Sequence, residues 1–234
     1  MKNKVAVIAA HPDDEVLGCG GTIAKHVYDG DEVHILIMAE GLTSRDYTRN
    51  AVAHALELSD LANAANAANK LLGTTSLTLK SLPDNRMDSL DRLDVIKLVE
   101  EFIQTHNPSI VYTHHIGDVN IDHRRIHEAV VTACRPLPNQ MVKTLLFFEV
   151  SSSTEWQPST SAPVFSPNWF IDISETLSLK LQALHAYETE MRPWPHARSV
   201  EALEHLARWR GATVGVNAAE AFVLGRNIIK AGIE

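Results

Sequence analysis

Val5-Ala-Val-Ile-Ala-Ala-His-Pro-Asp-Asp-Glu-Val-Leu-Gly-Cys-Gly-Gly21 joins an apolar, β-branched run to one histidine and three carboxylic acids. The apolar run is typical of a buried strand. Pro12 fixes its own φ and favours an extended His11, so the polar group begins where the strand ends. We expect the glycines of Gly18-Cys-Gly-Gly21 to let the backbone turn tightly into a helix over residues 22–28. Ligands of open α/β sheets bind at the carboxyl ends of strands, so this polar group is the first candidate site.

The composition fits a globular protein with a sizeable core. The chain has 234 residues, of which 45% are hydrophobic and 21% charged. A net charge of −8 argues against nucleic acid as the main partner, because proteins that bind a phosphate backbone are usually basic. No stretch approaches transmembrane length, and Met1–Lys4 lacks a signal-peptide core, so we expect a cytoplasmic protein that is not bound to a membrane. Cys19 and Cys134 are expected to be reduced, buried thiols.

Strand-like and helix-like segments alternate along the chain, which predicts a mostly parallel sheet with helices on both faces. We find no linker and expect one α/β domain over residues 1–234. After the first strand, the predicted strands are 32–39, 76–82, 109–113, 144–150 and 168–173. The predicted helices are 47–72, 91–106, 124–134, 175–188 and one that ends near 210, followed by a terminal segment over 218–228.

A second polar cluster, His114-His-Ile-Gly-Asp-Val-Asn-Ile-Asp-His123, also follows a predicted strand. Carboxyl ends of parallel strands share one edge of a sheet, so the two clusters should lie together. His11 and Asp14 can converge at their corner, and imidazole and carboxylate are good ligands for zinc or a similar divalent ion. A catalytic zinc usually has three protein ligands, and the second cluster can supply the third. Asp13 could face the open coordination position.

Residues of both clusters also suit simpler structural roles. Asp13 or Asp14 could cap a helix while Glu15 complements its dipole. His123 and His127, four residues apart on a helix, could form a metal pair by themselves, although one of them is more often structural. The glycines of the first motif do not match G-x-G-x-x-G, so a nucleotide cofactor is poorly supported.

Ala10-His-Pro-Asp-Asp-Glu-Val-Leu-Gly-Cys-Gly-Gly21, with Asp122-His123 after a later strand, resembles the PIG-L/LmbE family of zinc-dependent de-N-acetylases. The order and spacing of the strands fit from Lys4 to about Ile173. The segment from about residue 175 has no match to the shared motifs. The resemblance implies a Rossmann-like fold, a zinc cofactor with Fe²⁺ as another candidate, and hydrolysis of an N-acetyl group on a sugar such as an N-acetylglucosamine conjugate, which could be nucleotide-linked.

The resemblance also implies site residues. His11 and Asp14 match the zinc ligands of the first motif, Asp13 its general base, and His123 the third zinc ligand. The second motif is commonly His-Pro-Asp-His, whereas this chain has Asn120-Ile-Asp-His123. The family's first histidine is thought to stabilise the oxyanion or to protonate the leaving amine.

Asn120 can donate a hydrogen bond to an oxyanion but cannot be a general acid. His114, His115 or a protonated Asp13 could supply the proton to the amine, and the sequence does not choose between them. His115 and Asn120 are the candidate oxyanion donors. Asp122 is a candidate for orienting a neighbouring imidazole.

Substrate contacts are expected from arginines in loops near the same edge. Arg45, Arg86 and Arg192 could each bind sugar hydroxyls, a carboxylate or a phosphate. Arg192-Pro-Trp-Pro-His196 is stiffened by two prolines and is expected to close over the substrate. The expected partner is a small N-acetylated sugar conjugate, and a homo-oligomer is possible.

Two other functions use similar residues. A metal-dependent phosphoesterase could use such His/Asp clusters, but it usually needs further carboxylates for a second metal ion. A non-catalytic sugar- or nucleotide-binding module is possible because fold alone does not fix function. Acetate release, phosphate release and metal content distinguish the three hypotheses.

Overall fold

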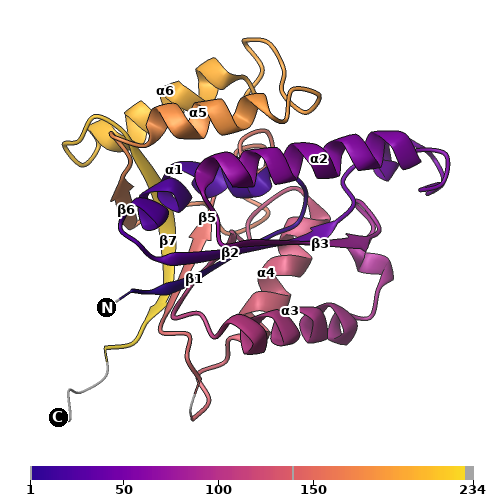
Figure 1. Cartoon of the computed structure of the whole chain (residues 1–234), viewed down its shortest axis with the longest axis horizontal. Helices are drawn as coiled ribbons and strands as arrows, with labels where there is room; N and C mark the ends of the chain where they lie inside the picture. The colour runs from indigo at the N-terminus through magenta and orange to yellow at the C-terminus, as the bar shows by residue number, and fades with distance from the viewer. Residues whose placement is uncertain (1, 139, 230–234) are drawn as a thin grey trace.

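The computed structural model describes residues 2–138 and 140–229. The described strands form one sheet in the order β3-β2-β1-β4-β5-β7-β6 (Figure 1). The strands are β1 (Lys4–Ala9), β2 (Glu32–Ala39), β3 (Ser76–Leu82), β4 (Ile110–His114), β5 (Thr144–Phe148), β6 (Trp169–Asp172) and β7 (Ala219–Asn227). The α-helices are α1 (Asp14–Tyr28), α2 (Ala55–Leu72), α3 (Arg92–His106), α4 (Ile121–Ala133), α5 (Leu177–His185) and α6 (Val200–Ala212).

The prediction of a mostly parallel sheet is confirmed. The neighbouring strands from β3 to β5 all pair in parallel, whereas β7 is antiparallel to both β5 and β6. In β1, residues Val5–Ala9 are fully buried, as expected for a central strand covered on both faces. The last described segment of the chain therefore supplies a strand inside the sheet, between β5 and β6.

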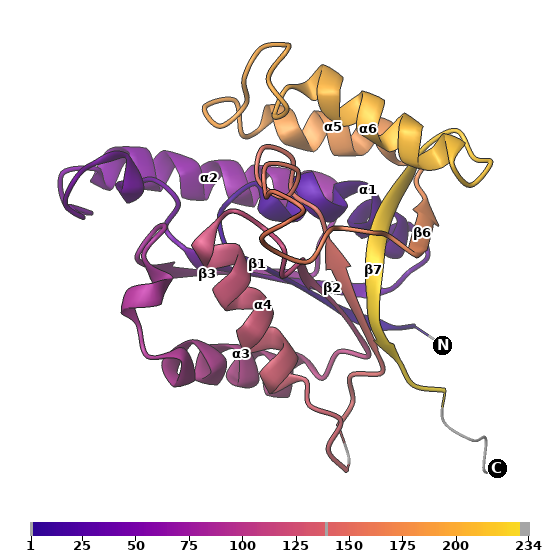
Figure 2. The same ribbon diagram turned by 180° about the vertical axis from the view of Figure 1, so that it is seen from behind.

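The helices form layers on the two faces of the sheet. Figures 1 and 2 show α3 and α4 on one face and α1 and α2 on the other, with α5 and α6 beyond α1 and α2. Each face has its own apolar core: Val5 and Val7 of β1 pack with Ile23 of α1, and Ile8 packs with Ile126 of α4. This packing fixes the turn between β1 and α1 and the turn between β4 and α4 at the same edge of the sheet.

The prediction for the first helix is wrong about its start. Helix α1 begins at Asp14, not at residue 22, and the glycine segment lies inside it beside a kink at Cys19. A Cβ atom on Gly18 would lie 2.4 Å from the Phe148 ring, and one on Gly21 would lie 2.7 Å from Ile173. The glycines therefore allow close packing of α1. The tight turn is made instead by Asp13, whose φ is 109°.

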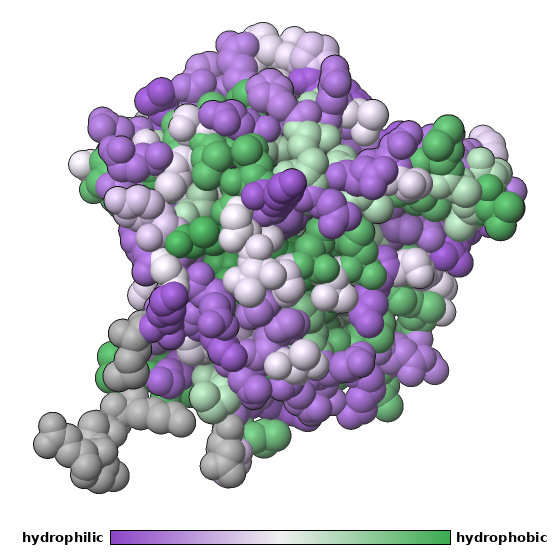
Figure 3. Space-filling model, viewed as in Figure 1, coloured by the Kyte–Doolittle hydropathy of each residue, from purple (hydrophilic) through white to green (hydrophobic). Residues whose placement is uncertain are grey.

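Other helix boundaries also differ from the prediction, and α5 is shorter at both ends than the predicted 175–188. Helix α2 begins at Ala55, and Figure 3 shows hydrophobic residues over its projecting end. Exposed Val52 and Leu56 lie there. Helix α4 begins at Ile121 because the Asn120 side chain caps it by accepting the Asp122 N–H at 2.9 Å. In the described part of the chain, no helix has the length and apolar composition needed to cross a bilayer.

Candidate functional site

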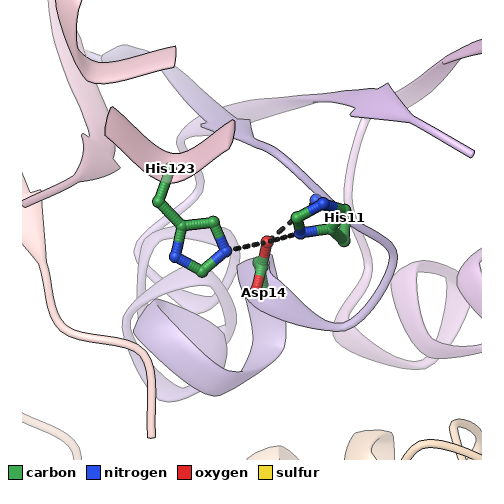
Figure 4. Close-up of side chains that lie close together, drawn as sticks. All are labelled: His11, Asp14 and His123. Carbon is green, nitrogen blue, oxygen red and sulfur yellow. Dashed lines mark hydrogen bonds and ion pairs between the residues drawn. The ribbon is translucent and has the colours of Figure 1, made fainter. Parts of the chain in front are cut away.

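The two polar clusters meet where strands β1 and β4 end. These strands pair in parallel, with Ile8 opposite Thr113. His11 and Asp14 lie at the β1–α1 corner, and His123 lies in the first turn of α4. One ligand atom from each of these three side chains lies within 4.8 Å of the others. Figure 4 shows both imidazoles directed at one carboxylate oxygen of Asp14.

The distances in this group suit a small divalent cation. Asp14 Oδ2 is 3.2 Å from His11 Nδ1 and 3.2 Å from His123 Nε2. Two atoms that share a tetrahedral zinc ion lie about 3.3 Å apart when their bonds to zinc are about 2.0–2.1 Å long. The three residues are buried, with His11 the most accessible at 9%. The group therefore fits zinc in ligand type and spacing.

His11 is oriented by two carboxylates on its far side. His11 Nε2 lies 3.0 Å from Asp122 Oδ2 and 3.2 Å from Asp84 Oδ1. The oxygens of Asp122 also accept the backbone N–H groups of Asn85 at 2.6 Å and Met87 at 3.0 Å. A proton on Nε2 leaves the Nδ1 lone pair facing Asp14, which is the arrangement that a metal-binding histidine needs.

His123 has an equivalent partner in Asp118. His123 Nδ1 lies 3.1 Å from Asp118 Oδ2. Asp118 also accepts hydrogen bonds from the Asn120 N–H at 2.8 Å, from Thr154 Oγ1 at 2.7 Å and from the Ser153 hydroxyl. These contacts hold the proton of His123 on Nδ1 and leave Nε2 free to bind a metal.

The site has an excess of buried negative charge. Five aspartates gather here, and within the described residues Arg198 is the one Lys or Arg side chain that forms an ion pair with any of them. The five are Asp13, Asp14, Asp84, Asp118 and Asp122. Burial lowers the pKa of His123, but Asp14 and Asp118 outweigh it and raise that pKa to about 9. The surroundings thus favour additional positive charge, as a cation would supply.

Asp13 is held in its left-handed conformation by Glu15. The Asp13 N–H donates to Glu15 Oε2 at 3.1 Å. Glu15 is fully buried and also accepts from the Tyr187 hydroxyl at 2.6 Å and from Asn69 Nδ2 at 2.9 Å. Asp13 occupies the N-cap position of α1, but its side chain makes no capping hydrogen bond. Helix capping therefore does not account for the Asp13 carboxylate.

The Asp13 carboxylate instead forms an ion pair. Asp13 Oδ2 accepts from Arg198 Nη1 at 3.0 Å. Burial raises the pKa of Asp13 to about 8, against the opposing effect of Arg198. A carboxyl group with such a pKa can accept and release a proton near neutral pH.

The histidines at the end of β4 have different surroundings. His114 stacks on His123 with ring centroids 4.0 Å apart, and its Nε2 accepts the Ala10 N–H at 2.8 Å. His115 Nδ1 accepts the Gly117 N–H at 3.0 Å, which places its proton on Nε2. Burial lowers the pKa of His115 to about 4, so this imidazole is neutral at pH 7.

Asn120 and His127, two further candidates from the sequence, make structural hydrogen bonds. The Asn120 oxygen is used as the cap of α4, so its Nδ2 is the part that can donate to a ligand. His127 donates to the His114 carbonyl at 2.9 Å and is not in a metal-binding group of the described residues. His123 thus groups with His11 and Asp14, whereas His127 Nδ1 is used by a backbone carbonyl.

The three arginines predicted to bind substrate have other partners here. Arg45 forms an ion pair with Glu190 at 2.8 Å. Arg86 donates to two backbone carbonyls of the loop that contains Arg45, at 3.1 and 3.3 Å. Arg192 also donates to two backbone carbonyls, each at 2.8 Å. The described contacts thus join none of the three to the His11, Asp14 and His123 group.

Sequence reasoning missed three residues of the site. Asp118 lies in the second polar cluster, and Asp84 follows strand β3 at the same edge of the sheet, so strand-end position could have identified both. Arg198 is 185 residues from Asp13 along the chain, and no local pattern connects them.

The fold and site define an α/β protein with a buried His/Asp group at the carboxyl edge of a parallel sheet. A family model, PIG-L (GlcNAc-PI de-N-acetylase), matches residues 6–134. The chain belongs to this deacetylase family, which confirms the resemblance seen in the sequence.

Curated relatives extend the similarity beyond the matched region. The chain is 28% identical over 191 residues to YaiS of Escherichia coli (strain K12), an uncharacterized deacetylase, covering 79% of this chain and 90% of YaiS. It is 27% identical over 199 residues to a probable N-acetyl-α-D-glucosaminyl L-malate deacetylase 2 of Bacillus cereus (strain ATCC 14579), covering 81% and 84% of the two chains.

Among solved structures, GalB, the 4-carboxy-2-hydroxymuconate hydratase of Pseudomonas putida KT2440, is similar with a TM-score of 0.77. The two sequences are 21% identical, and the match covers 100% of both chains. At this identity the likeness confirms the fold and does not choose the reaction.

Proposed function

We propose that this protein is a zinc-dependent hydrolase that removes the acetyl group from a small N-acetylated sugar conjugate of the N-acetylglucosamine type. The observation that carries the proposal is the buried group of His11, Asp14 and His123 beside Asp13, in a chain that belongs to the GlcNAc-PI de-N-acetylase family. The probable malate-conjugate deacetylase of Bacillus cereus supports the substrate class. A nucleotide-linked sugar is a further candidate substrate.

His11, Asp14 and His123 would hold the metal ion. Asp122 and Asp118 support this role, since each accepts the proton on the far nitrogen of one imidazole. The bound ion would supply Lewis acidity and lower the pKa of the reacting water. Zinc suits two imidazoles and one carboxylate, and Fe²⁺ is the alternative.

Asp13 acts as the general base in this proposal. It precedes the ligand Asp14, so its carboxylate lies beside the metal-binding group without being part of it. It takes a proton from the water that attacks the acetyl carbonyl. Its raised pKa of about 8 suits a group that first accepts this proton and then delivers it.

The oxyanion and the leaving amine need different groups. His115 Nε2–H and Asn120 Nδ2 are the proposed donors to the oxyanion. The neutral state of His115 at pH 7 suits hydrogen-bond donation and argues against His115 as the general acid. Because Asn120 cannot release a proton, the protonated Asp13 is the proposed acid for the amine.

The substrate and setting of the enzyme follow the same proposal. Arg45, Arg86 and Arg192 remain candidate substrate contacts, for which their present partners would have to be exchanged. The proposed partner is a small molecule rather than nucleic acid or a membrane. The protein would act in the cytoplasm as a single domain, and homo-oligomers are compatible with this proposal.

The Asp13→Asn variant tests the assignment of the base. The amide that replaces the carboxylate cannot accept the water proton, whereas the three ligands are unchanged. We expect one metal ion per chain and a loss of acetate release of at least about 100-fold, since general bases contribute about 10²- to 10⁴-fold. Asp60→Asn on the exposed face of α2 is the matched control. Full activity of Asp13→Asn would refute the role of Asp13.

A further inference from the structure

Arg198 enters the site from a distant part of the chain. It directly precedes Ser199, the N-cap of α6, and its side chain is 22% exposed. Its Nη1 donates to Asp13 Oδ2 at 3.0 Å, and its Nε donates to Ser152 Oγ at 3.0 Å. The guanidinium thus connects the turn after β1 with the turn after β5.

The backbone of Arg198 and the turn that contains Ser152 are both held by further hydrogen bonds. The backbone N–H of Arg198 donates to His196 Nδ1 at 3.0 Å, and its carbonyl accepts from Arg192 at 3.2 Å. Ser152 has a φ of 67° and donates its N–H to Glu155 Oε1 at 2.6 Å. The planar guanidinium therefore approaches Asp13 from a defined direction.

The contact distinguishes the two oxygens of Asp13. Oδ2 is occupied by Arg198, whereas Oδ1 accepts no hydrogen bond from the described residues. A general base needs one oxygen aimed at the reacting water, and an unrestrained carboxylate can rotate about its Cβ–Cγ bond. A fixed Oδ2 determines where Oδ1 points.

We infer that Arg198 is a positioning residue that orients Asp13, so that Oδ1 receives the proton of the attacking water. This inference rests on the proposed role of Asp13 as the base. Arg198 acts through Asp13 and is not a metal ligand.

The turn that contains Ser152 gives Arg198 a second connection to the site. The neighbouring Ser153 and Thr154 hydroxyls donate to Asp118, the carboxylate that orients His123. One short segment after β5 therefore fixes the partner of the base and the partner of a proposed metal ligand. Among the described residues, Arg198 itself makes no hydrogen bond to Asp118.

The kinetic test compares Arg198→Met, Arg198→Lys and Arg208→Met. Arg208 lies on α6, pairs with Glu204 alone among the described residues and is 55% exposed, so its variant is the matched control. For Arg198→Met we expect kcat for acetate release to fall about 10- to 100-fold, part of the contribution of a general base. KM should change less than about threefold, and bound metal should stay at the wild-type level. Lysine retains the charge and should restore part of kcat.

Guanidinium rescue separates positioning from a merely structural role. Added guanidinium ions should raise kcat of Arg198→Ala severalfold without affecting Arg208→Met. An unchanged kcat in Arg198→Met would overturn the inference. A rise in KM alone would also overturn it, because it would make Arg198 a substrate contact.

A measurement without substrate keeps the inference testable if the wild type releases no acetate. Arg198→Met leaves the buried Asp13 carboxyl group without its charged hydrogen-bond partner and should lower the melting temperature, and adding Asp13→Asn should restore part of that loss. If both melting-temperature changes are observed while the wild-type protein hydrolyses none of the amides, the Arg198–Asp13 contact is supported and the proposed function fails. If the melting temperatures are additive, the contact does not restrain Asp13 and the inference fails.

Discussion

Asp118→Asn tests whether the surroundings of His123 prepare it for a metal ion. Asp118 uses its two oxygens to accept four hydrogen bonds, two on each oxygen. Asparagine has one acceptor oxygen, so one pair of donors must face its NH₂ group. The Ser153 and Thr154 hydroxyls can rotate to accept from that group, but the Asn120 N–H and His123 Nδ1–H cannot.

The expected magnitude depends on which way the new amide turns. If its oxygen faces His123, the partly buried Asn120 N–H loses its acceptor, which costs up to about 1–3 kcal/mol of folding free energy. If its nitrogen faces His123, the imidazole is no longer held with Nε2 free, and metal affinity should fall about 10- to 100-fold. A loss of that size is about 1.4–2.7 kcal/mol of binding free energy.

Two assays measure both outcomes. Competition with a zinc-binding dye gives the metal affinity, and urea unfolding of metal-free protein gives the stability. Asp60→Asn removes an exposed aspartate and should change neither quantity. If Asp118→Asn binds zinc within twofold of wild type and unfolds at the same urea concentration, Asp118 does not support His123 and the account of this site is wrong.

Two further predictions concern the turn between β4 and α4. His115 has a pKa of about 4 when folded against 6.5 in a free histidine, so below pH 6.5 only the unfolded chain takes up its proton. Its contribution to stability is complete above pH 6.5 and should fall by about 2 kcal/mol between pH 7 and pH 5, a loss absent from His115→Gln and measurable by urea unfolding at each pH. An equal pH dependence in both proteins would contradict this. Gly117→Ala places a Cβ 1.7 Å from the Pro163 carbonyl oxygen, so the loop before β6 must move, at a cost of about 1–3 kcal/mol. Limited proteolysis should cut this loop faster in the variant, and an unchanged rate and stability would show that the loop does not pack there.

The sequence predicted the parts of the structure that depend on local pattern. Short apolar or alternating segments predicted the strands from β1 to β6, and the polar residues that follow β1 and β4 predicted the group of His11, Asp14 and His123 that could hold a metal ion. The two clusters lie together because parallel strands place their carboxyl ends at one edge of the sheet.

The features that sequence pattern did not reveal depend on tertiary contacts. The glycines of Gly18–Gly21 suggested a turn, but they lie inside α1 because Phe148 and Ile173 approach its backbone too closely for a side chain. Strand β7 joins the sheet between β5 and β6, a pairing that its own sequence does not specify. Arg198 reaches Asp13 only through the packing of α6.

The catalytic roles remain predictions that the geometry supports. His11, Asp14 and His123 meet as expected, and Asp122 contacts His11 as proposed for an orienting carboxylate. Asn120 was expected to replace a catalytic histidine, and its capping of α4 adds a structural reason for an asparagine at this position.

Acetate release by the metal-loaded wild-type protein tests the central claim most directly. The substrates are a panel of N-acetylglucosamine conjugates that includes malate-linked and nucleotide-linked sugars, with phosphate release measured in parallel. The account predicts acetate release from at least one conjugate, its loss after chelation and its return with one equivalent of zinc. Acetate release that persists after complete removal of metal, or phosphate release without acetate from any conjugate, would contradict a zinc-dependent de-N-acetylase.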